Sequence, residues 1–280
     1  MSNKKSRIDH EIGIIGMGRV GSVLAYQGQK VGLRIAVIQD SNPKVLDQIG
    51  QLLSVMPSTN ETDLQKCSVV IVAVPDREID AVTQRLLSKK LITAGTLLAH
   101  TNGFHVWDTA TMEREYGVIA GSIHPLMAFP QNPLDARSLN GIGFSLDGVD
   151  EARKELAVLV ERFHGIPLKI PADGKILYHI AAVFASNFPV ALQGIALEIF
   201  QSIGMGKDTA RTMLNALLDS VRQNLSVNEP CKAISGPAAR GDWKTIETHI
   251  VELKVRYPDL VELYQVLTDA VVKMLKVKER

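Results

Sequence analysis

A glycine-rich segment near the start of the chain constrains its fold more than any other feature. The sequence GMGRVG, residues 16–21, directly follows the apolar run Glu11–Ile15 and opens a helical pattern, Val20–Val31. In such a segment the first glycine makes a tight turn, the second lets a ligand approach the backbone, and the third lets the helix pack against the strand. The segment therefore predicts a strand, a glycine turn and a helix, which together begin a βαβ unit.

Apolar runs typical of buried strands alternate with helical patterns over residues 1–170. The predicted strands are Glu11–Ile15, Arg34–Ile38, Ser68–Val74, Thr96–Ala99, Val118–Ile123, Gly141–Leu146 and Pro167–Ile170. The predicted helices are Val20–Val31, Lys44–Leu53, Arg77–Leu87 and Asp150–Phe163. Because crossovers between parallel strands are right-handed, this alternation predicts an α/β fold with a doubly wound (Rossmann) parallel sheet.

The strand signal ends at Pro171, and the remaining residues have only helical patterns. These runs are Lys175–Ile203, Asp208–Leu225, Asp242–Lys254 and Leu260–Leu275. We therefore expect a dinucleotide-binding domain over residues 1–170 and an all-helical domain for substrate binding and dimerisation over residues 171–280.

One helical run, Ile176–Phe200, is long enough to span a membrane and has a single acidic residue, Glu198. Polar residues and a proline interrupt it, at His179, Ser186, Asn187, Pro189 and Gln193. A helix that is apolar on nearly all sides is more often central in a domain or at a subunit interface. We therefore expect a homodimer formed through the helical domain, and no membrane partner.

The composition indicates which binding partners and which cellular compartment to expect. With 31 Lys and Arg against 30 Asp and Glu, the net charge of +1 provides no basic field for a nucleic-acid backbone. The two cysteines, Cys67 and Cys231, form neither a disulfide framework nor a metal-binding pair. The polar N-terminus lacks the apolar region of a signal peptide. These features predict a cytoplasmic protein that binds a small molecule, without a metal.

The glycine turn and an acidic residue about twenty positions later predict a dinucleotide site. A pyrophosphate at the N-terminus of the helix would meet free backbone N–H groups and the positive end of the helix dipole. Asp40 ends the second predicted strand, where a carboxylate binds the ribose hydroxyls of NAD and repels the extra phosphate of NADP. Two alternatives stay open: Asp40 is a helix N-cap or a turn residue, or it turns away and the Ser41–Lys44 segment holds that phosphate.

The other predicted strands of the sheet end in further candidate residues. Val74 and Pro75 follow the third strand, and Asp76 is expected to cap the next helix. Asn102 follows the fourth strand, near His100, and His124 follows the fifth. Histidines at this edge suit proton transfer beside a hydride. The alternative is a structural hydrogen bond to a backbone carbonyl, which we favour for His100 and leave open for His124.

The helical half carries the remaining candidates. Five polar residues recur along one apolar helix: Lys175, Tyr178, His179, Ser186 and Asn187. They either form a hydrogen-bond network that fixes helix packing or line a face that covers the nicotinamide. In the segment 235–242 (SGPAARGD), a rigid turn holds Arg240, which suits a substrate carboxylate, a cofactor phosphate or an ion pair between domains.

The ordered motifs GMGRVGS, AVPD, HTNG, SIHPL, LYHIAAVFASN and SGPAARGD resemble bacterial proteins that join a Rossmann-like domain to a C-terminal helical domain of unknown function (2520 type). Such proteins are distantly similar to pyrroline-5-carboxylate reductase, prephenate dehydrogenase and ketopantoate reductase. The resemblance implies a dimeric nicotinamide-dependent oxidoreductase. Ketopantoate reductases have a lysine and two asparagines at four-residue spacing. With Asn187 as the last of these, His179 stands at the lysine position and Val183 at the first asparagine.

We therefore expect an oxidoreductase that uses NADP or NAD to reduce a small, ketopantoate-like 2-oxo acid or an imine. The alternative is a dinucleotide-binding redox sensor without catalysis. The expected catalytic residues are His179, His124 and Asn187, and the expected substrate-binding residues are Arg240 and Ser186. The expected cofactor-binding residues are Gly16, Met17, Gly18, Arg19, Val20, Gly21, Asp40, Ser41, Val74, Pro75 and Asn102.

Overall fold

The computed structural model describes residues 6–55, 57–136 and 138–276. The chain divides into two compact units, of which the first ends at Pro189 and the second begins at Val190. The two units are described separately.

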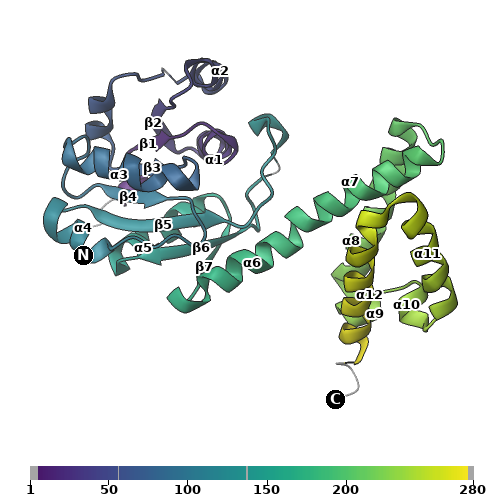
Figure 1. Cartoon of the computed structure of the whole chain (residues 1–280). Helices are drawn as coiled ribbons and strands as arrows, with labels where there is room; N and C mark the ends of the chain where they lie inside the picture. Colours follow the sequence, from purple (N-terminus) through teal and green to yellow (C-terminus); the bar gives the residue numbers. More distant parts are fainter. Residues whose placement is uncertain (1–5, 56, 137, 277–280) are drawn as a thin grey trace. The chain divides into compact units, whose positions relative to one another are not determined.

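The first unit is built on a seven-stranded sheet (Figure 1). Its strands are β1 (Glu11–Ile15), β2 (Arg34–Gln39), β3 (Val69–Val72), β4 (Leu97–His100), β5 (Ile119–Pro125), β6 (Gly143–Gly148) and β7 (Ile166–Lys169). The strand order is β2-β1-β3-β4-β5-β6-β7, and the strands from β2 to β5 pair in parallel. The predicted combination of a Rossmann sheet with a helical C-terminal region is confirmed.

The expectation of an entirely parallel sheet is wrong at β6, which is antiparallel to β5. Between these strands the described chain contains only a short 3-10 helix, η4 (Pro133–Asp135), and no crossover helix. Without a crossover the returning strand enters the sheet from the opposite end. β7 then pairs with β6 in parallel, after the intervening helix α5 (Asp150–Arg162).

Buried side chains form a separate hydrophobic core on each face of the sheet, as the two-residue period of a strand requires. Ile12 and Ile14 of β1 lie in one core, which packs against α1 (Arg19–Lys30), α2 (Pro43–Leu53) and α5. Ile15 lies in the other core, with residues of α3 (Ile79–Ser88) and α4 (Thr109–Tyr116). The central strands are therefore covered on both faces.

Several short elements in this unit were not predicted from the sequence. The longest are the 3-10 helix η2 (Glu61–Lys66) and the helix α4. Each of these two buries a single residue, Leu64 in η2 and Met112 in α4. A short element with one buried side chain has no apolar periodicity to detect.

The first unit also includes the helix α6 (Lys175–Ala185), so it extends beyond the boundary at residues 170/171 that the sequence predicts. Polar contacts explain the difference, because Lys175 pairs with Asp147 of β6, and Tyr178 is hydrogen-bonded to His124 of β5. The end of the strand signal therefore does not coincide with the end of the compact unit.

The predicted continuous helix over Lys175–Ile203 is interrupted at Ser186. The Ser186 hydroxyl donates to the Ala182 carbonyl oxygen, and the helix α7 (Asn187–Ser202) begins at the next residue. Pro189 explains a break here, since proline lacks an N–H and its ring clashes with the carbonyl four residues earlier.

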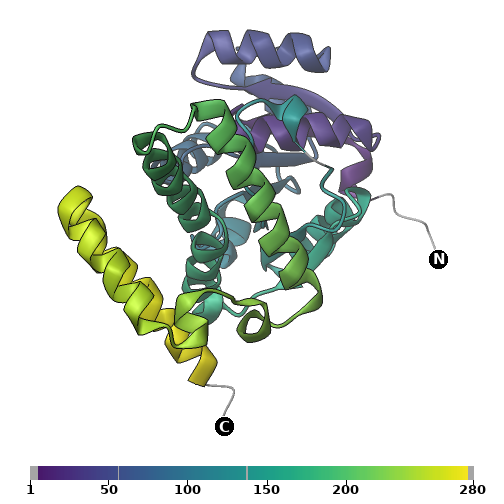
Figure 2. The ribbon, with the colours of Figure 1, turned by 90° about the vertical axis from the view of Figure 1, so that its right-hand side faces the viewer.

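The second unit is helical, as expected. Besides most of α7, it contains α8 (Lys207–Val227), α9 (Pro230–Ala233), α10 (Pro237–Arg240), α11 (Trp243–Arg256), η6 (Pro258–Leu260) and α12 (Val261–Lys276). α11 and α12 form a hairpin through η6, and α10 packs against both helices (Figures 1 and 2). Asp242 caps α11 by accepting a hydrogen bond from the Thr245 N–H.

By length and composition, one helical stretch in the described chain could cross a membrane: Lys175–Ser202, with a mean hydropathy of 1.7. Central and interface helices of soluble proteins have the same composition. Apolar side chains are also widely exposed on α8, including Leu217, Val221 and Leu225.

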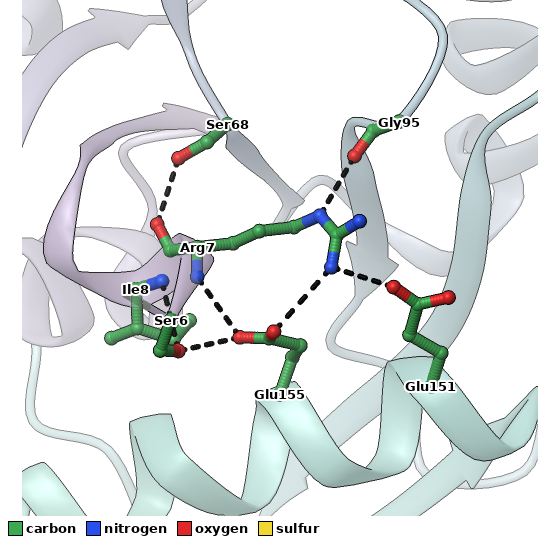
Figure 3. A network of polar contacts seen from close by, with 7 residues as sticks. All are labelled: Ser6, Arg7, Ile8, Ser68, Gly95, Glu151 and Glu155. Carbon is green, nitrogen blue, oxygen red and sulfur yellow. Dashed lines mark hydrogen bonds and ion pairs between the residues drawn. The ribbon is translucent and has the colours of Figure 1, made fainter. Parts of the chain in front are cut away.

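Polar contacts join the N-terminal segment to α5 and to Ser68, the residue before β3 (Figure 3). The Arg7 guanidinium donates to the Gly95 carbonyl oxygen and pairs with Glu151 and Glu155 of α5. The Glu155 carboxylate also accepts from the Ser6 hydroxyl and the Arg7 N–H. Glu155 therefore joins the N-terminal segment to α5 through three donors.

We predict that Glu155→Ala lowers the free energy of unfolding by about 1–2 kcal/mol, because the half-buried donors around it lose their acceptor. Glu151→Ala is the matched control, since Glu151 makes one ion pair and its side chain is 54% exposed; about 0.5 kcal/mol or less is expected. Urea denaturation measures both values. Equal losses in the two variants would contradict the account.

Candidate functional site

Two adjoining cavities lie along the edge of the sheet where the parallel strands end. The first has a volume of about 600 Å³ and is lined by residues from the ends of β1, β2 and β3. The second has a volume of about 370 Å³ and is lined by residues from the loops after β3, β4 and β5. Both cavities are lined by Gly18, Ala73, Val74 and Pro75. They therefore form two compartments that meet at the glycine turn.

The glycine turn has the geometry that the sequence predicts. Gly16 has a φ of +92°, and a Cβ there would lie 2.5 Å from the Ala73 carbonyl oxygen. A Cβ on Gly21 would overlap the Gly16 carbonyl oxygen, so only glycine lets α1 begin this close to β1. A Cβ on Gly18 would meet nothing within 4 Å. Gly18 therefore faces open space, at the position where a pyrophosphate would approach the backbone.

Asp40 lines the first cavity, and its carboxylate bonds to two backbone groups. One oxygen accepts from the Met17 N–H at 2.6 Å, and the other accepts from the Asn42 N–H at 2.8 Å. Asn42, not Asp40, caps the helix α2. Asp40 thus joins the glycine turn to the end of β2, and Ser41 and Asn42 line the cavity beside it.

The second cavity brings together most of the residues expected near the nicotinamide. Its lining includes Arg19 and Val20 at the start of α1, Asn102 after β4, His124 in β5 and His179 on α6. The His124 and His179 ring centroids lie 6.4 Å apart, and Phe104 lies 5.1 Å from His179. Both histidine candidates therefore line one compartment.

Asn102 and Gly103 shape the wall of the second cavity. The Asn102 side-chain oxygen accepts from the backbone N–H groups of Phe104 and His105, at 2.8 and 2.6 Å, which fixes a turn after β4. A Cβ on Gly103 would lie 2.9 Å from Cε1 of His124. The backbone of this turn therefore packs directly against the His124 imidazole.

Burial lowers the pKa of His124 to about 4, with a further lowering by His179 and Lys175 and an opposing effect of Asp76. The imidazole is therefore neutral at pH 7. His124 thus differs from a histidine with an ordinary pKa of about 6.5, which is partly protonated near neutral pH. A neutral imidazole still donates a hydrogen bond through one ring nitrogen and accepts through the other.

His100 lies in the interior beneath the cavity and does not line it. Its side chain is 1% exposed, and its Nδ1 accepts from the Asn102 N–H at 3.2 Å. Burial lowers the pKa of His100 to about 3. This environment agrees with the structural alternative for His100.

Asp76 is not the cap that the sequence predicts. It is the first residue of the 3-10 helix η3 (Asp76–Glu78), and Glu78 occupies the N-cap position of α3. Asp76 instead lines the second cavity.

Five predicted site residues do not line either cavity: Met17 and Gly21 of the glycine turn, and Ser186, Asn187 and Arg240. The Ser186 hydroxyl bonds to the Ala182 carbonyl and to the Asn187 side chain at the break between α6 and α7. The helical spacing expected between His179 and Asn187 is therefore lost. Arg240 lies exposed at the end of α10 in the second unit.

Several lining residues were not among the predicted ones. Ser58, Thr59 and Arg85 line the first cavity, and Gly103 and Phe129 line the second. Of these residues, only Gly103 could have been found from the sequence, because it is a glycine in the loop that follows the fourth predicted strand. No group of three or more potential metal ligands occurs among the described residues.

The cavities fit a dinucleotide. Gly18 leaves room at the junction, and the N-terminus of α1 directs free backbone N–H groups toward it. The residues of the first cavity would hold the adenosine half, and those of the second would hold the nicotinamide.

Comparison with known families agrees with this geometry. Residues 11–97 match the family described as NADP oxidoreductase, coenzyme F420-dependent, and residues 142–271 match a domain of unknown function. The chain joins an NADP oxidoreductase domain to that C-terminal domain. It is thus an NAD(P)-dependent oxidoreductase, and NADP is the cofactor of the matching family. The match does not identify a substrate.

Solved structures share the fold of this oxidoreductase over nearly its whole length. A candidate NADP oxidoreductase from Bacteroides fragilis is 21% identical, with a TM-score of 0.81 and coverage of 96% of this chain and 100% of the other. Pyrroline-5-carboxylate reductase from Streptococcus pyogenes is 16% identical, with a TM-score of 0.64 and coverage of 95% and 98%. The NADP-bound Plasmodium falciparum pyrroline carboxylate reductase is 12% identical, with a TM-score of 0.62 and coverage of 96% and 99%. Among curated proteins, none matches the sequence.

We predict that acid destabilises the fold partly through His124. An unfolded histidine gains its proton near pH 6.5, whereas the folded His124 gains it only near pH 4. Between these values the unfolded state binds more protons, so the free energy of unfolding decreases as the pH is lowered. When the pH is lowered from 7 to 4.5, the free energy of unfolding should decrease by about 2–3 kcal/mol less in His124→Gln than in the wild type.

Urea denaturation at a series of pH values measures this difference. The control is His10→Gln, at an exposed position, which should leave the pH dependence unchanged. If His124→Gln showed the same pH dependence as the wild type, the neutral state of His124 would be refuted.

Proposed function

We propose that this protein uses NADPH to reduce a small 2-oxo acid or an imine at the second cavity. The observation that carries the proposal is the pair of cavities that meet at Gly18, with His124 and His179 in the compartment away from Asp40. When bound, the cofactor would supply the hydride. The chain would hold it in place and supply the proton.

The cofactor-binding roles follow from position. Gly16, Gly18 and Gly21 form the turn that admits the pyrophosphate, with Met17, Arg19 and Val20 beside it. Asp40 and Ser41 would border the ribose of the adenosine half, whereas Val74, Pro75 and Asn102 would border the nicotinamide. Because two backbone groups already occupy the Asp40 carboxylate, Ser41 and Asn42 are the closer polar partners for the extra phosphate of NADP.

For the substrate, His124 and His179 are the proposed proton donors, and Asn187, Ser186 and Arg240 remain proposed contributors. A positioned arginine suits the carboxylate of a 2-oxo acid, and an imidazole suits the oxygen or nitrogen that gains the proton. The two free cysteines fit a reducing compartment, and we propose a cytoplasmic location.

Turnover tests this function. NADPH oxidation should be followed with ketopantoate, pyruvate and 1-pyrroline-5-carboxylate as probes, each with NADH in parallel. We expect NADPH-dependent turnover of one probe class. Tight NADPH binding without turnover of any 2-oxo acid or imine would favour the dinucleotide sensor instead.

We predict that Gly18→Val abolishes NADPH binding and leaves the fold intact. The added side chain would occupy the open space that the pyrophosphate needs, and it meets no protein atom at its Cβ. Calorimetry should show at least a 100-fold loss of affinity, with an unchanged circular dichroism spectrum. Gly194→Val is the control, since Gly194 on α7 also faces open space, has no positive φ and lines neither cavity. Unchanged affinity in Gly18→Val would refute the site.

We also propose a homodimer formed through the helical unit. Leu217, Val221 and Leu225 recur every four residues on α8 and are 59%, 48% and 47% exposed. An exposed apolar stripe of this kind marks an interaction surface.

Light scattering at micromolar concentration should therefore give twice the chain mass of 30.6 kDa. Leu217→Asp combined with Val221→Asp should yield monomers, because a buried charge opposes association. Gln223→Asp, on the same helix but off the stripe, should remain dimeric. A monomeric wild type would contradict the proposal.

A further inference from the structure

A row of buried polar side chains crosses the sheet beneath the second cavity. His100 of β4, Ser122 of β5 and Asp147 of β6 lie in register on neighbouring strands, and His124 and Ser145 form the next pair along β5 and β6. His100, Ser122 and Ser145 are 1%, 3% and 4% exposed. These residues share the face of the sheet that Leu98 and Ala120 line with apolar side chains.

Buried polar groups are costly unless they are paired, so a row of them in an otherwise apolar sheet requires an explanation. The helix α6 provides partners for this row. Lys175 is 3% exposed, and its Nζ lies 2.6 Å from Oδ2 of Asp147. Among the described residues, Asp147 is the one polar partner of the Lys175 side chain. This ion pair holds the first turn of α6 on β6.

One turn later, Tyr178 reaches the histidine of the cavity. Its hydroxyl lies 3.3 Å from Nδ1 of His124, and the two rings meet edge to face with centroids 5.7 Å apart. The Ser145 hydroxyl is a further partner of Tyr178. Because Lys175 and Tyr178 lie on adjacent turns of one helix, the ion pair fixes the position of the tyrosine.

The protonation states allow the Tyr178 hydroxyl to donate this hydrogen bond to Nδ1 of His124. Burial raises the pKa of Tyr178, so the hydroxyl keeps its proton, and His124 is neutral at pH 7. If the hydroxyl donates to Nδ1, the imidazole carries its proton on Nε2. Within the described chain Nε2 has no hydrogen-bond partner, and the His124 ring lines the cavity.

We propose that Tyr178 and His124 form a proton relay to the second cavity, with Lys175 and Asp147 as the pair that positions Tyr178. This inference rests on the proposed reductase function. It adds Tyr178 as a residue that acts through His124, and it replaces an imidazolium donor with a neutral one.

In a carbonyl substrate, the carbon gains the hydride, and the π electrons of the C=O bond move to oxygen. The oxygen takes the proton from Nε2 of His124, while Nδ1 takes the proton from the Tyr178 hydroxyl. Water then returns a proton to the phenolate, and the imidazole returns to its Nε2–H tautomer once the product leaves.

The relay changes the expected pH profile. The titratable groups that face His124 are His179 and Asp76 at the cavity, Lys175 and Tyr178 on α6, and His100 behind it. A neutral relay needs no imidazolium, so turnover should not fall as the pH rises from 5.5 to 7.5. A donor with an ordinary histidine pKa would lose about tenfold in the protonated fraction over this range.

Tyr178→Phe tests the relay, and the chain provides a matched control. In the second unit Tyr264 bonds to Nδ1 of His249 at 2.7 Å, with ring centroids 5.8 Å apart and edge-to-face geometry. Tyr264→Phe removes the same hydroxyl from the same type of pair, and Tyr264 lines neither cavity.

The first readout needs no substrate. Long-range ¹H–¹⁵N NMR of the histidine rings should show His124 as the Nε2–H tautomer in the wild type and in Tyr264→Phe. In Tyr178→Phe the tautomers should mix. A wild-type Nδ1–H tautomer, or an unchanged His124 spectrum in Tyr178→Phe, would overturn the relay.

The second readout is turnover of whichever probe, ketopantoate or 1-pyrroline-5-carboxylate, the wild type reduces. Tyr178→Phe should lower kcat about 10- to 100-fold with the NADPH KM unchanged, and Tyr264→Phe should keep the wild-type kcat. A wild-type kcat in Tyr178→Phe would overturn the relay. If neither probe is reduced, the proposed function fails on these probes, and the NMR result alone decides whether Tyr178 holds His124 in the donor tautomer.

Discussion

The close contact between the start of α1 and the end of β1 is the constraint on which the site depends. Because Gly21 has no side chain, the first turn of α1 lies against the Gly16 carbonyl, and the positive φ of Gly16 lets the chain turn beneath Ala73. This contact sets the N-terminus of α1 between the two cavities, and Gly18 opens toward both. A larger residue at position 21 would move the helix and disrupt both compartments.

A second set of contacts links the cavity to the interior of the sheet. The Lys175–Asp147 pair holds α6 on β6, and the same helix carries His179 to the wall of the second cavity and Tyr178 to the His124 ring. Gly103 also packs closely against the His124 imidazole. The histidine is therefore held between a loop after β4 and a helix that follows β7, and its burial keeps it neutral.

Local signals explain what the sequence could predict. The glycine turn, β1 and the alternation of strands and helices depend on residues close in sequence, and all three were predicted correctly. The reversal at β6 and the break at Ser186 were missed, because a missing crossover and a proline inside an apolar run have weak patterns. The Tyr178–His124 contact joins residues 54 positions apart, so no local pattern could reveal it.

A crystal structure of the NADPH complex tests the central claim most directly. The account predicts the pyrophosphate at the Gly18 backbone, the adenosine ribose beside Asp40 and Ser41, and the nicotinamide in the second cavity against Gly103 and His124. It also predicts that Tyr178 stays hydrogen-bonded to Nδ1 of His124. A nicotinamide bound outside the second cavity, or a pyrophosphate away from the glycine turn, would contradict it.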